Sequence, residues 1–224
     1  MIANPFHPAK FISFEGIDGS GKSEQFTRVK HFLRAYRKDI KWKETKEPTD
    51  QPLGQEIYQI LLGTHPTVSL ENIHPHDFQE LYYFQDRIWD YKHRIIPDLN
   101  SGWHVLVDRG PVSVVFGAED DRDLGPLMEK QEQTFSKANT QFIWPDLILI
   151  YDVDIDIAIH RLKKKGRKLD KFEEREKLQR VRENYLAFAK MYENCVVING
   201  NLGENEVFMQ AKPHIFHCLD INGD

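Results

Sequence analysis

Four short apolar runs indicate strands, and a further strand is indicated where Ile40 and Trp42 alternate with lysines; amphipathic stretches separate them. We expect five strands, at residues 10–15, 40–47, 103–107, 147–151 and 196–198. The run at 147–151 is apolar throughout, which is typical of a strand buried on both faces. Such strands belong to parallel sheets that helices cover on either side.

The amphipathic stretches between these runs predict the helices. Apolar side chains recur every three or four residues at 22–37, 53–62, 75–100, 124–140, 155–164 and 172–192. A last stretch, 204–221, has helical character that Pro213 interrupts. The expected core stripe of the longest helix is Phe78, Leu81, Phe84, Ile88, Tyr91, Ile95 and Leu99. Strands that alternate with helices, without a linker or an internal repeat, predict one α/β domain over residues 1–224.

Composition and charge limit the function. The 224 residues carry a net charge of −5, and a general nucleic-acid binder would need a basic surface instead. Cys195 and Cys218 have neither metal-ligand nor redox spacing, so we expect reduced thiols. No apolar run reaches transmembrane length, and the first residues lack the pattern of a signal peptide. We therefore expect a cytoplasmic protein without a membrane partner.

The first strand runs into a glycine-rich turn, Gly16-x-x-x-x-Gly21-Lys22-Ser23, and then into a helix. This order is the phosphate loop of nucleotide-binding proteins. Glycines let backbone N–H groups surround phosphate oxygens, and the helix N-terminus adds partial positive charge. Lys22 would reach the outer phosphates, and the Ser23 hydroxyl would bind Mg²⁺. The expected ATP-binding residues are Gly16, Gly19, Ser20, Gly21, Lys22 and Ser23.

A second acidic position follows the strand at 103–107. Asp108 stands where that strand ends, and the carboxyl ends of parallel strands meet at one edge of the sheet. An acid there is typical of the second Mg²⁺-holding motif of phosphate-loop enzymes. The alternative is an ordinary acid in the turn that follows a strand.

Three classes of phosphate-loop protein are possible. A GTPase would carry Asn-Lys-x-Asp, which this sequence lacks, and a large motor or transport ATPase would need a longer chain. A small kinase has about this length and needs a mobile basic lid. The positive residues of the segment 163–171 fit such a lid, since cations stabilise the charge of a transferring phosphoryl group. The alternative for this segment is a solvated helix end.

Several motifs taken together resemble the thymidylate kinase family, from about Lys10 to Ile198. They are Phe14-Glu15-Gly16-Ile17-Asp18-Gly19-Ser20-Gly21-Lys22-Ser23, Glu47-Pro48, Leu53-Gly54, Tyr83 with Arg87, Asp108-Arg109, Pro145-Asp146-Leu147 and Leu169-Asp170-Lys171-Phe172-Glu173. The resemblance implies a three-layer P-loop kinase fold with a basic lid at about 163–173. It also implies transfer of the ATP γ-phosphoryl group to dTMP with Mg²⁺, in a homodimer.

The resemblance also implies roles for single residues. Asp18 would accept a hydrogen bond from the sugar 3′-hydroxyl of the acceptor, and Arg109 would bridge the phosphates of the two nucleotides. Tyr83 would stack on the base, and Arg87 would donate to a base carbonyl. Lys46, Glu47 and Ser113 complete the expected acceptor site. Among family members with glycine after the loop aspartate, as at Gly19, the catalytic cation lies in the lid, which points to Lys165, Arg167 or Lys171; Arg167 is preferred for its planar fork.

The chain also departs from the family pattern. Lys46 stands where the family usually has arginine, and Gly110-Pro111 follows Arg109 in place of an aromatic residue or histidine. The family's Ala-Tyr-Gln, which helps to read the base, is replaced by Val115-Phe116-Gly117. Two alternatives to dTMP phosphorylation are therefore kept: a related kinase for another pyrimidine nucleotide, and a nucleotide-binding protein that has lost transfer.

Overall fold

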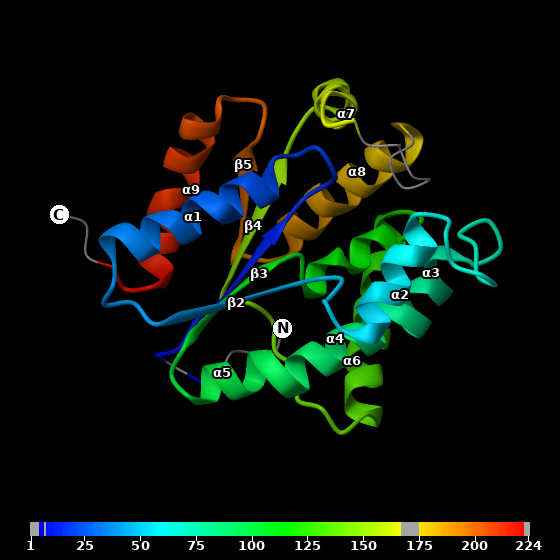
Figure 1. The fold of residues 1–224 in the computed structure, drawn as a ribbon, viewed down its shortest axis with the longest axis horizontal. Helices are drawn as coiled ribbons and strands as arrows, with labels where there is room; N and C mark the ends of the chain where they lie inside the picture. The colour runs from blue at the N-terminus through cyan, green and yellow to red at the C-terminus, as the bar shows by residue number, and fades with distance from the viewer. Residues whose placement is uncertain (1–4, 7, 167–174, 222–224) are drawn as a thin grey trace.

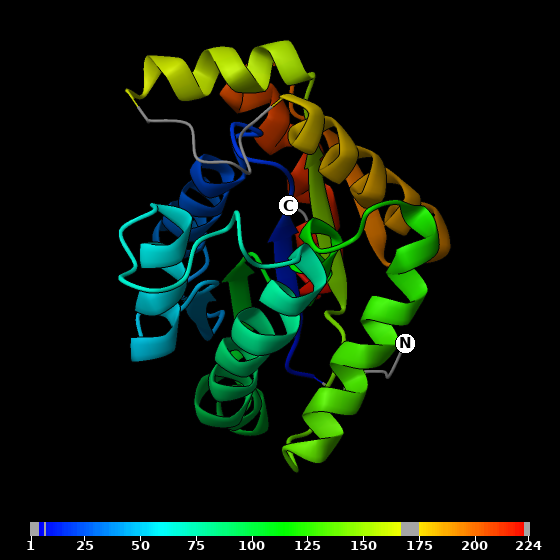
Figure 2. The same ribbon diagram turned by 90° about the vertical axis from the view of Figure 1, so that its right-hand side faces the viewer.

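The computed structural model describes residues 5–6, 8–166 and 175–221. Its centre is a parallel sheet of five strands in the order β2-β3-β1-β4-β5. The strands are β1 (Phe11–Glu15), β2 (Trp42–Lys46), β3 (His104–Asp108), β4 (Leu147–Asp152) and β5 (Cys195–Asn199). All five lie within two residues of the predicted ranges at each end, and the first five residues of β4 are buried as expected. In Figure 2 the strand arrows point toward the end of the sheet where α7 (Ile155–Lys164) lies.

Helices cover both faces of the sheet, which confirms the predicted three-layer α/β fold (Figure 1). The helices are α1 (Lys22–Tyr36), α2 (Pro52–Leu61), α3 (Pro75–Phe78), α4 (Phe84–Asp90), α5 (Ile96–Asn100), α6 (Leu124–Lys137), α7, α8 (Arg175–Met191) and α9 (Glu204–Cys218). Alternation along the strands explains the layers, because neighbouring side chains point to opposite faces. Phe11 joins the core formed with α4, α6 and α8, whereas Ile12 joins the core formed with α1 and α9.

The predicted helix at 75–100 is one helical segment interrupted by two π-helical turns, at Gln79–Tyr83 and Tyr91–Ile95. A π turn adds a residue to the helical repeat and rotates the positions within it. Leu81, expected in the core stripe, is therefore 60% exposed. The other six residues of that stripe are buried as predicted.

Helix α9 continues through Pro213, so the predicted interruption there is wrong. Proline removes one backbone donor from the helical ladder. The apolar face of α9 nevertheless packs on the sheet through Val207, Ala211 and Ile215, and tertiary packing of this kind supplies most of the stability of a helix. Pro213 itself lies on the exposed side. None of the helices in the described ranges is both long and apolar enough to cross a membrane.

A buried carboxyl group in this fold predicts a pH-dependent stability. Burial raises the pKa of Asp90 to about 7, although the Thr45 hydroxyl donates to it at 2.9 Å. In the unfolded chain the same group has a pKa of about 4. The folded state therefore holds the proton more tightly, and the stability that this provides is lost as the pH rises from about 4 to about 7.

We expect Asp90→Asn to become progressively more stable relative to the wild type over this pH window. Urea unfolding at pH 4.5, 6 and 7.5 measures the difference. Asp39→Asn is the control, since Arg37 lowers the pKa of the exposed Asp39 and its contribution has the opposite sign. A difference between wild type and Asp90→Asn that does not change with pH would contradict the prediction.

Candidate active site

The phosphate loop occupies the turn between β1 and α1. Gly16, Gly19 and Gly21 all have positive φ, at 141°, 80° and 92°. A Cβ on Gly19 would lie 2.5 Å from the carbonyl oxygen of Ala158 in α7, so the close approach of α7 also requires glycine there. The loop thus curls tightly, and α1 starts directly after it at Lys22. This is the backbone geometry that binds phosphate oxygens.

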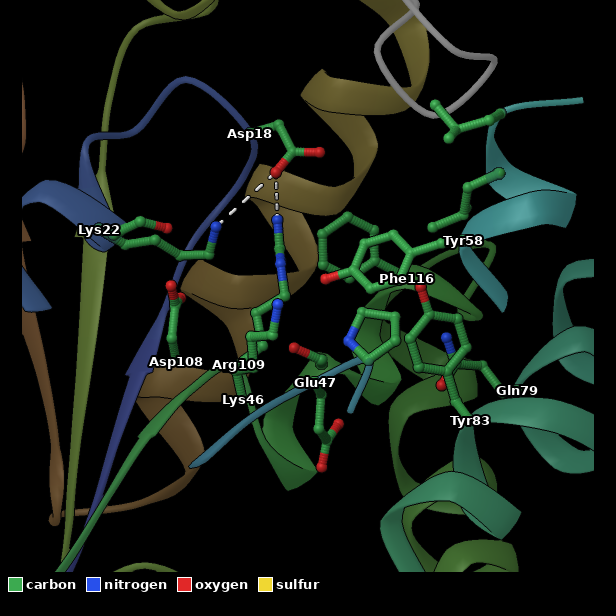
Figure 3. Close-up of a pocket in the computed structure, with 15 residues that line it drawn as sticks. Asp18, Lys22, Lys46, Glu47, Tyr58, Gln79, Tyr83, Asp108, Arg109 and Phe116 are labelled. Carbon is green, nitrogen blue, oxygen red and sulfur yellow. Dashed lines mark hydrogen bonds and ion pairs between the residues drawn. The ribbon is translucent and has the colours of Figure 1, made fainter. Parts of the chain in front are cut away.

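A cavity of about 980 Å³, including open solvent at its mouth, lies beside this loop (Figure 3). It is lined by Asp18, Lys22, Ser23, Lys46, Glu47, Pro48, Tyr58, Leu61, Leu62, Gln79, Tyr83, Asp108, Arg109, Ser113 and Phe116. The structure therefore brings together nine of the predicted catalytic and binding residues. The charged groups of the loop and β3 lie at one end of the cavity and the aromatic side chains at the other (Figure 3).

Two cations, Lys22 and Arg109, and two carboxylates, Asp18 and Asp108, form the charged end. Asp18 accepts a hydrogen bond from Nη2 of Arg109, and its Oδ1 lies 3.7 Å from the ammonium of Lys22. Arg109 also donates to the carbonyl of Gly16 at 3.1 Å. Burial lowers the pKa of Lys22, and repulsion from Arg109 lowers it further, whereas Asp108 and Asp18 oppose this shift. The arrangement keeps two positive groups aimed at one region, which suits a ligand that carries several phosphates.

Asp108 offers an anionic ligand beside the loop. Its Oδ1 is buried and has no hydrogen-bond partner among the described residues. Ser23 lines the same cavity, so a hydroxyl and a carboxylate oxygen are both present where the phosphates of a nucleotide would lie. Oxygen ligands of this kind fit Mg²⁺, which is held by one or two protein groups and by substrate phosphates.

The other end of the cavity is mainly aromatic. Tyr58, Tyr83 and Phe116 surround it, and Lys46 places its ammonium 5.5 Å from the ring of Tyr58. The guanidinium of Arg109 lies 4.7 Å from the ring of Phe116, so this ring also helps to hold Arg109 in place. Flat apolar walls next to cations are suited to a ligand with a planar ring and a phosphate.

Arg87 lies behind the cavity wall and does not line it. Its Nε and Nη2 donate to the two oxygens of Glu47 at 2.7 and 2.6 Å, and its Nη1 donates to Gln131. The guanidinium is fully buried in these contacts. Arg87 therefore orients Glu47, which lines the cavity, and the expected contact of Arg87 with a base carbonyl stays a prediction.

Glu15 organises the cavity floor, and the sequence reasoning missed it. Its carboxylate accepts hydrogen bonds from the Gly110 backbone at 2.9 Å, from Ser113 at 2.9 Å and from Tyr185 at 3.0 Å. A Cβ at residue 110 would lie 3.0 Å from Oγ of Ser13, so the glycine lets the chain pass closely over β1. The signal available in the sequence was an acidic residue at the end of a strand that is mainly apolar.

The proposed lid is described only in part. Lys165 is exposed at the C-terminal end of α7 and does not line the cavity. Arg167 and Lys171 lie outside the described residues.

Comparison with known proteins agrees with the family resemblance of the sequence motifs. The family model for thymidylate kinase matches residues 14–211. A thymidylate kinase of Thermosipho melanesiensis is 32% identical over 94% of this chain and 99% of its own length. A probable thymidylate kinase of Archaeoglobus fulgidus is 32% identical over 94% of this chain and 96% of its own. The chain therefore belongs to the thymidylate kinase family.

Proposed function

We propose that this protein transfers the γ-phosphoryl group of ATP to dTMP, giving ADP and dTDP. The observation that carries the proposal is the two-ended cavity, with Lys22, Asp18 and Arg109 at its charged end and aromatic side chains at the other end. The relatives that bear the name thymidylate kinase match nearly the whole chain, which supports the same activity.

The donor phosphates bind to the loop. The backbone N–H groups around Gly16, Gly19, Ser20 and Gly21 face their oxygens, and Lys22 neutralises the outer phosphates. Ser23 and Asp108 would hold Mg²⁺, and the bound ion would screen the charge that develops on the phosphoryl oxygens. Arg109, already directed into the cavity by Asp18, contacts the phosphates of both substrates.

The acceptor nucleotide fills the other end. Tyr83 stacks on the base, and Asp18 accepts a hydrogen bond from the sugar 3′-hydroxyl. Lys46 contacts the acceptor phosphate through a single ammonium group, whereas the arginine that is usual in the family would donate two parallel hydrogen bonds. Glu47 and Ser113 shape the wall, each held by a buried partner, Arg87 and Glu15 respectively.

A coupled assay of ADP release tests the proposal across dTMP, dUMP, UMP, dCMP and thymidine. We expect dTMP to give the highest kcat/KM. If thymidine is the only substrate that is turned over, the acceptor is not a nucleoside monophosphate and the proposal is overturned. A preference for another pyrimidine monophosphate would favour the second candidate, which the altered segment Val115-Phe116-Gly117 supports.

The homodimer and the cytoplasmic location that the sequence implies belong to the same proposal. Light scattering after size exclusion tests the first, with a mass of twice 26.4 kDa expected. Fractionation of cells tests the second.

A further inference from the structure

Gln79 places a carboxamide in the cavity wall. Its side chain lines the cavity, and the residue is 2% exposed. Its Oε1 is buried and has no hydrogen-bond partner among the described residues. Buried polar groups are nearly always satisfied, and an exception at a binding cavity points to a ligand that supplies the partner.

The chain makes room for this side chain. A Cβ on Gly117 would lie 2.6 Å from Cγ of Gln79, so any larger residue at 117 would displace it. The φ of Gly117 is −82°, an ordinary value, and space is therefore the reason for glycine at this position. Gln79 also opens the π-helical turn that ends at Tyr83. Figure 3 shows Gln79, Tyr83 and Phe116 on the same side of the cavity, away from Lys22 and Asp108.

We propose that Gln79 hydrogen-bonds the edge of the acceptor base, an inference that rests on the proposed function. In the proposed function Tyr83 stacks on one face of the base. A side chain beside Tyr83 in the cavity wall, such as Gln79, then lies at the edge of the base. A carboxamide presents one acceptor and an N–H donor side by side. These match the N3–H donor and the O4 acceptor of thymine or uracil. Three of the five N–H donors of Arg87 are engaged by Glu47 and Gln131. Gln79 lines the cavity, whereas Arg87 lies behind Glu47.

Gln79→Met tests the proposal, because methionine keeps the length of the side chain and removes both polar groups. We expect KM for dTMP to rise roughly 10- to 100-fold, with kcat and KM for ATP little changed. The melting temperature should not fall, since Oε1 has no partner to lose. Gln85→Met, an exposed position in α4, is the matched control and should leave KM unchanged.

A modified acceptor separates base reading from a structural role. N3-methyl-dTMP lacks the N3–H donor, so the wild type should use it much less well than dTMP. In Gln79→Met the ratio of the two KM values should shrink at least about 5-fold, because the lost contact no longer distinguishes them. A ratio equal to that of the wild type would overturn the proposal.

Gly117→Ala provides a second variant, which keeps the carboxamide group but displaces it, because the added Cβ would meet Cγ of Gln79. It should raise KM for dTMP in the same direction and by a smaller factor. An unchanged KM in both variants would overturn the assignment of Gln79. If the wild type prefers another pyrimidine monophosphate, dTMP fails as the acceptor. In that case the KM of the wild type and of Gln79→Met for the preferred acceptor decides whether Gln79 contacts the base.

Discussion

Replacing Lys22 with methionine is expected to lower kcat about 10³-fold while the fold stays intact. The ammonium lies in the cavity between Asp18 and Asp108, next to the loop that would hold the donor phosphates. A fixed cation there stabilises the charge of the transferring phosphoryl group, and 10³-fold corresponds to about 4 kcal/mol of transition-state free energy. Methionine keeps the buried apolar stem, so the free energy of unfolding should not fall.

Single-turnover measurement of phosphoryl transfer, with thermal unfolding on the same samples, checks this expectation. Lys30→Met is the matched control, because Lys30 lies on the same helix but pairs with Glu44 at 2.8 Å, outside the cavity. We expect the control to retain its activity. A kcat for Lys22→Met within 10-fold of the wild type would remove Lys22 from the transfer step.

Sheet and layers were predictable because each depends on local patterns. An apolar run such as residues 147–151 is typical of a strand covered on both faces. The glycine loop between β1 and α1 carries its own geometry, and parallel strands bring Asp108 to the same edge. The charged end of the site therefore followed from the motifs and from topology.

The positions within the 75–100 segment were less predictable. A π turn has no clear pattern in the sequence, yet the one at Gln79–Tyr83 moves Leu81 to the surface and places Gln79 at the cavity. The pairing of Arg87 with Glu47 joins residues 40 positions apart. Such pairs depend on how α4 packs against the chain after β2, which periodicity does not report.

The hydrogen bonds around Glu15 could not be predicted from the sequence for the same reason. Its partners at 110, 113 and 185 come from three separate segments that meet only in the folded chain. The network also explains how the chain tolerates Gly110-Pro111 after Arg109, because Glu15 fixes the backbone there directly. Ser113 therefore still lies on the cavity wall, although the segment before it departs from the family pattern.

Asp108→Asn is expected to lower kcat about 10²- to 10³-fold without lowering the melting temperature. Asparagine keeps the shape of the side chain but loses the negative charge that the metal requires. In the described structure Oδ1 of Asp108 has no hydrogen-bond partner, so neutralising it removes a buried charge that is poorly satisfied. Activity and stability should therefore change independently.

Asp152→Asn is the matched control, at the end of β4, which β1 separates from β3 in the sheet. Its carboxylate accepts from Arg182 at 2.5 and 2.9 Å, so asparagine there should lower stability and leave kcat nearly unchanged. Calorimetric titration of ATP at several Mg²⁺ concentrations adds a readout that does not depend on turnover. Asp108→Asn should weaken the Mg²⁺ dependence of ATP binding, and Asp152→Asn should not. Because the two strand ends differ in their partners, a loss of stability in both variants would mean that Asp108 serves the fold and not the metal.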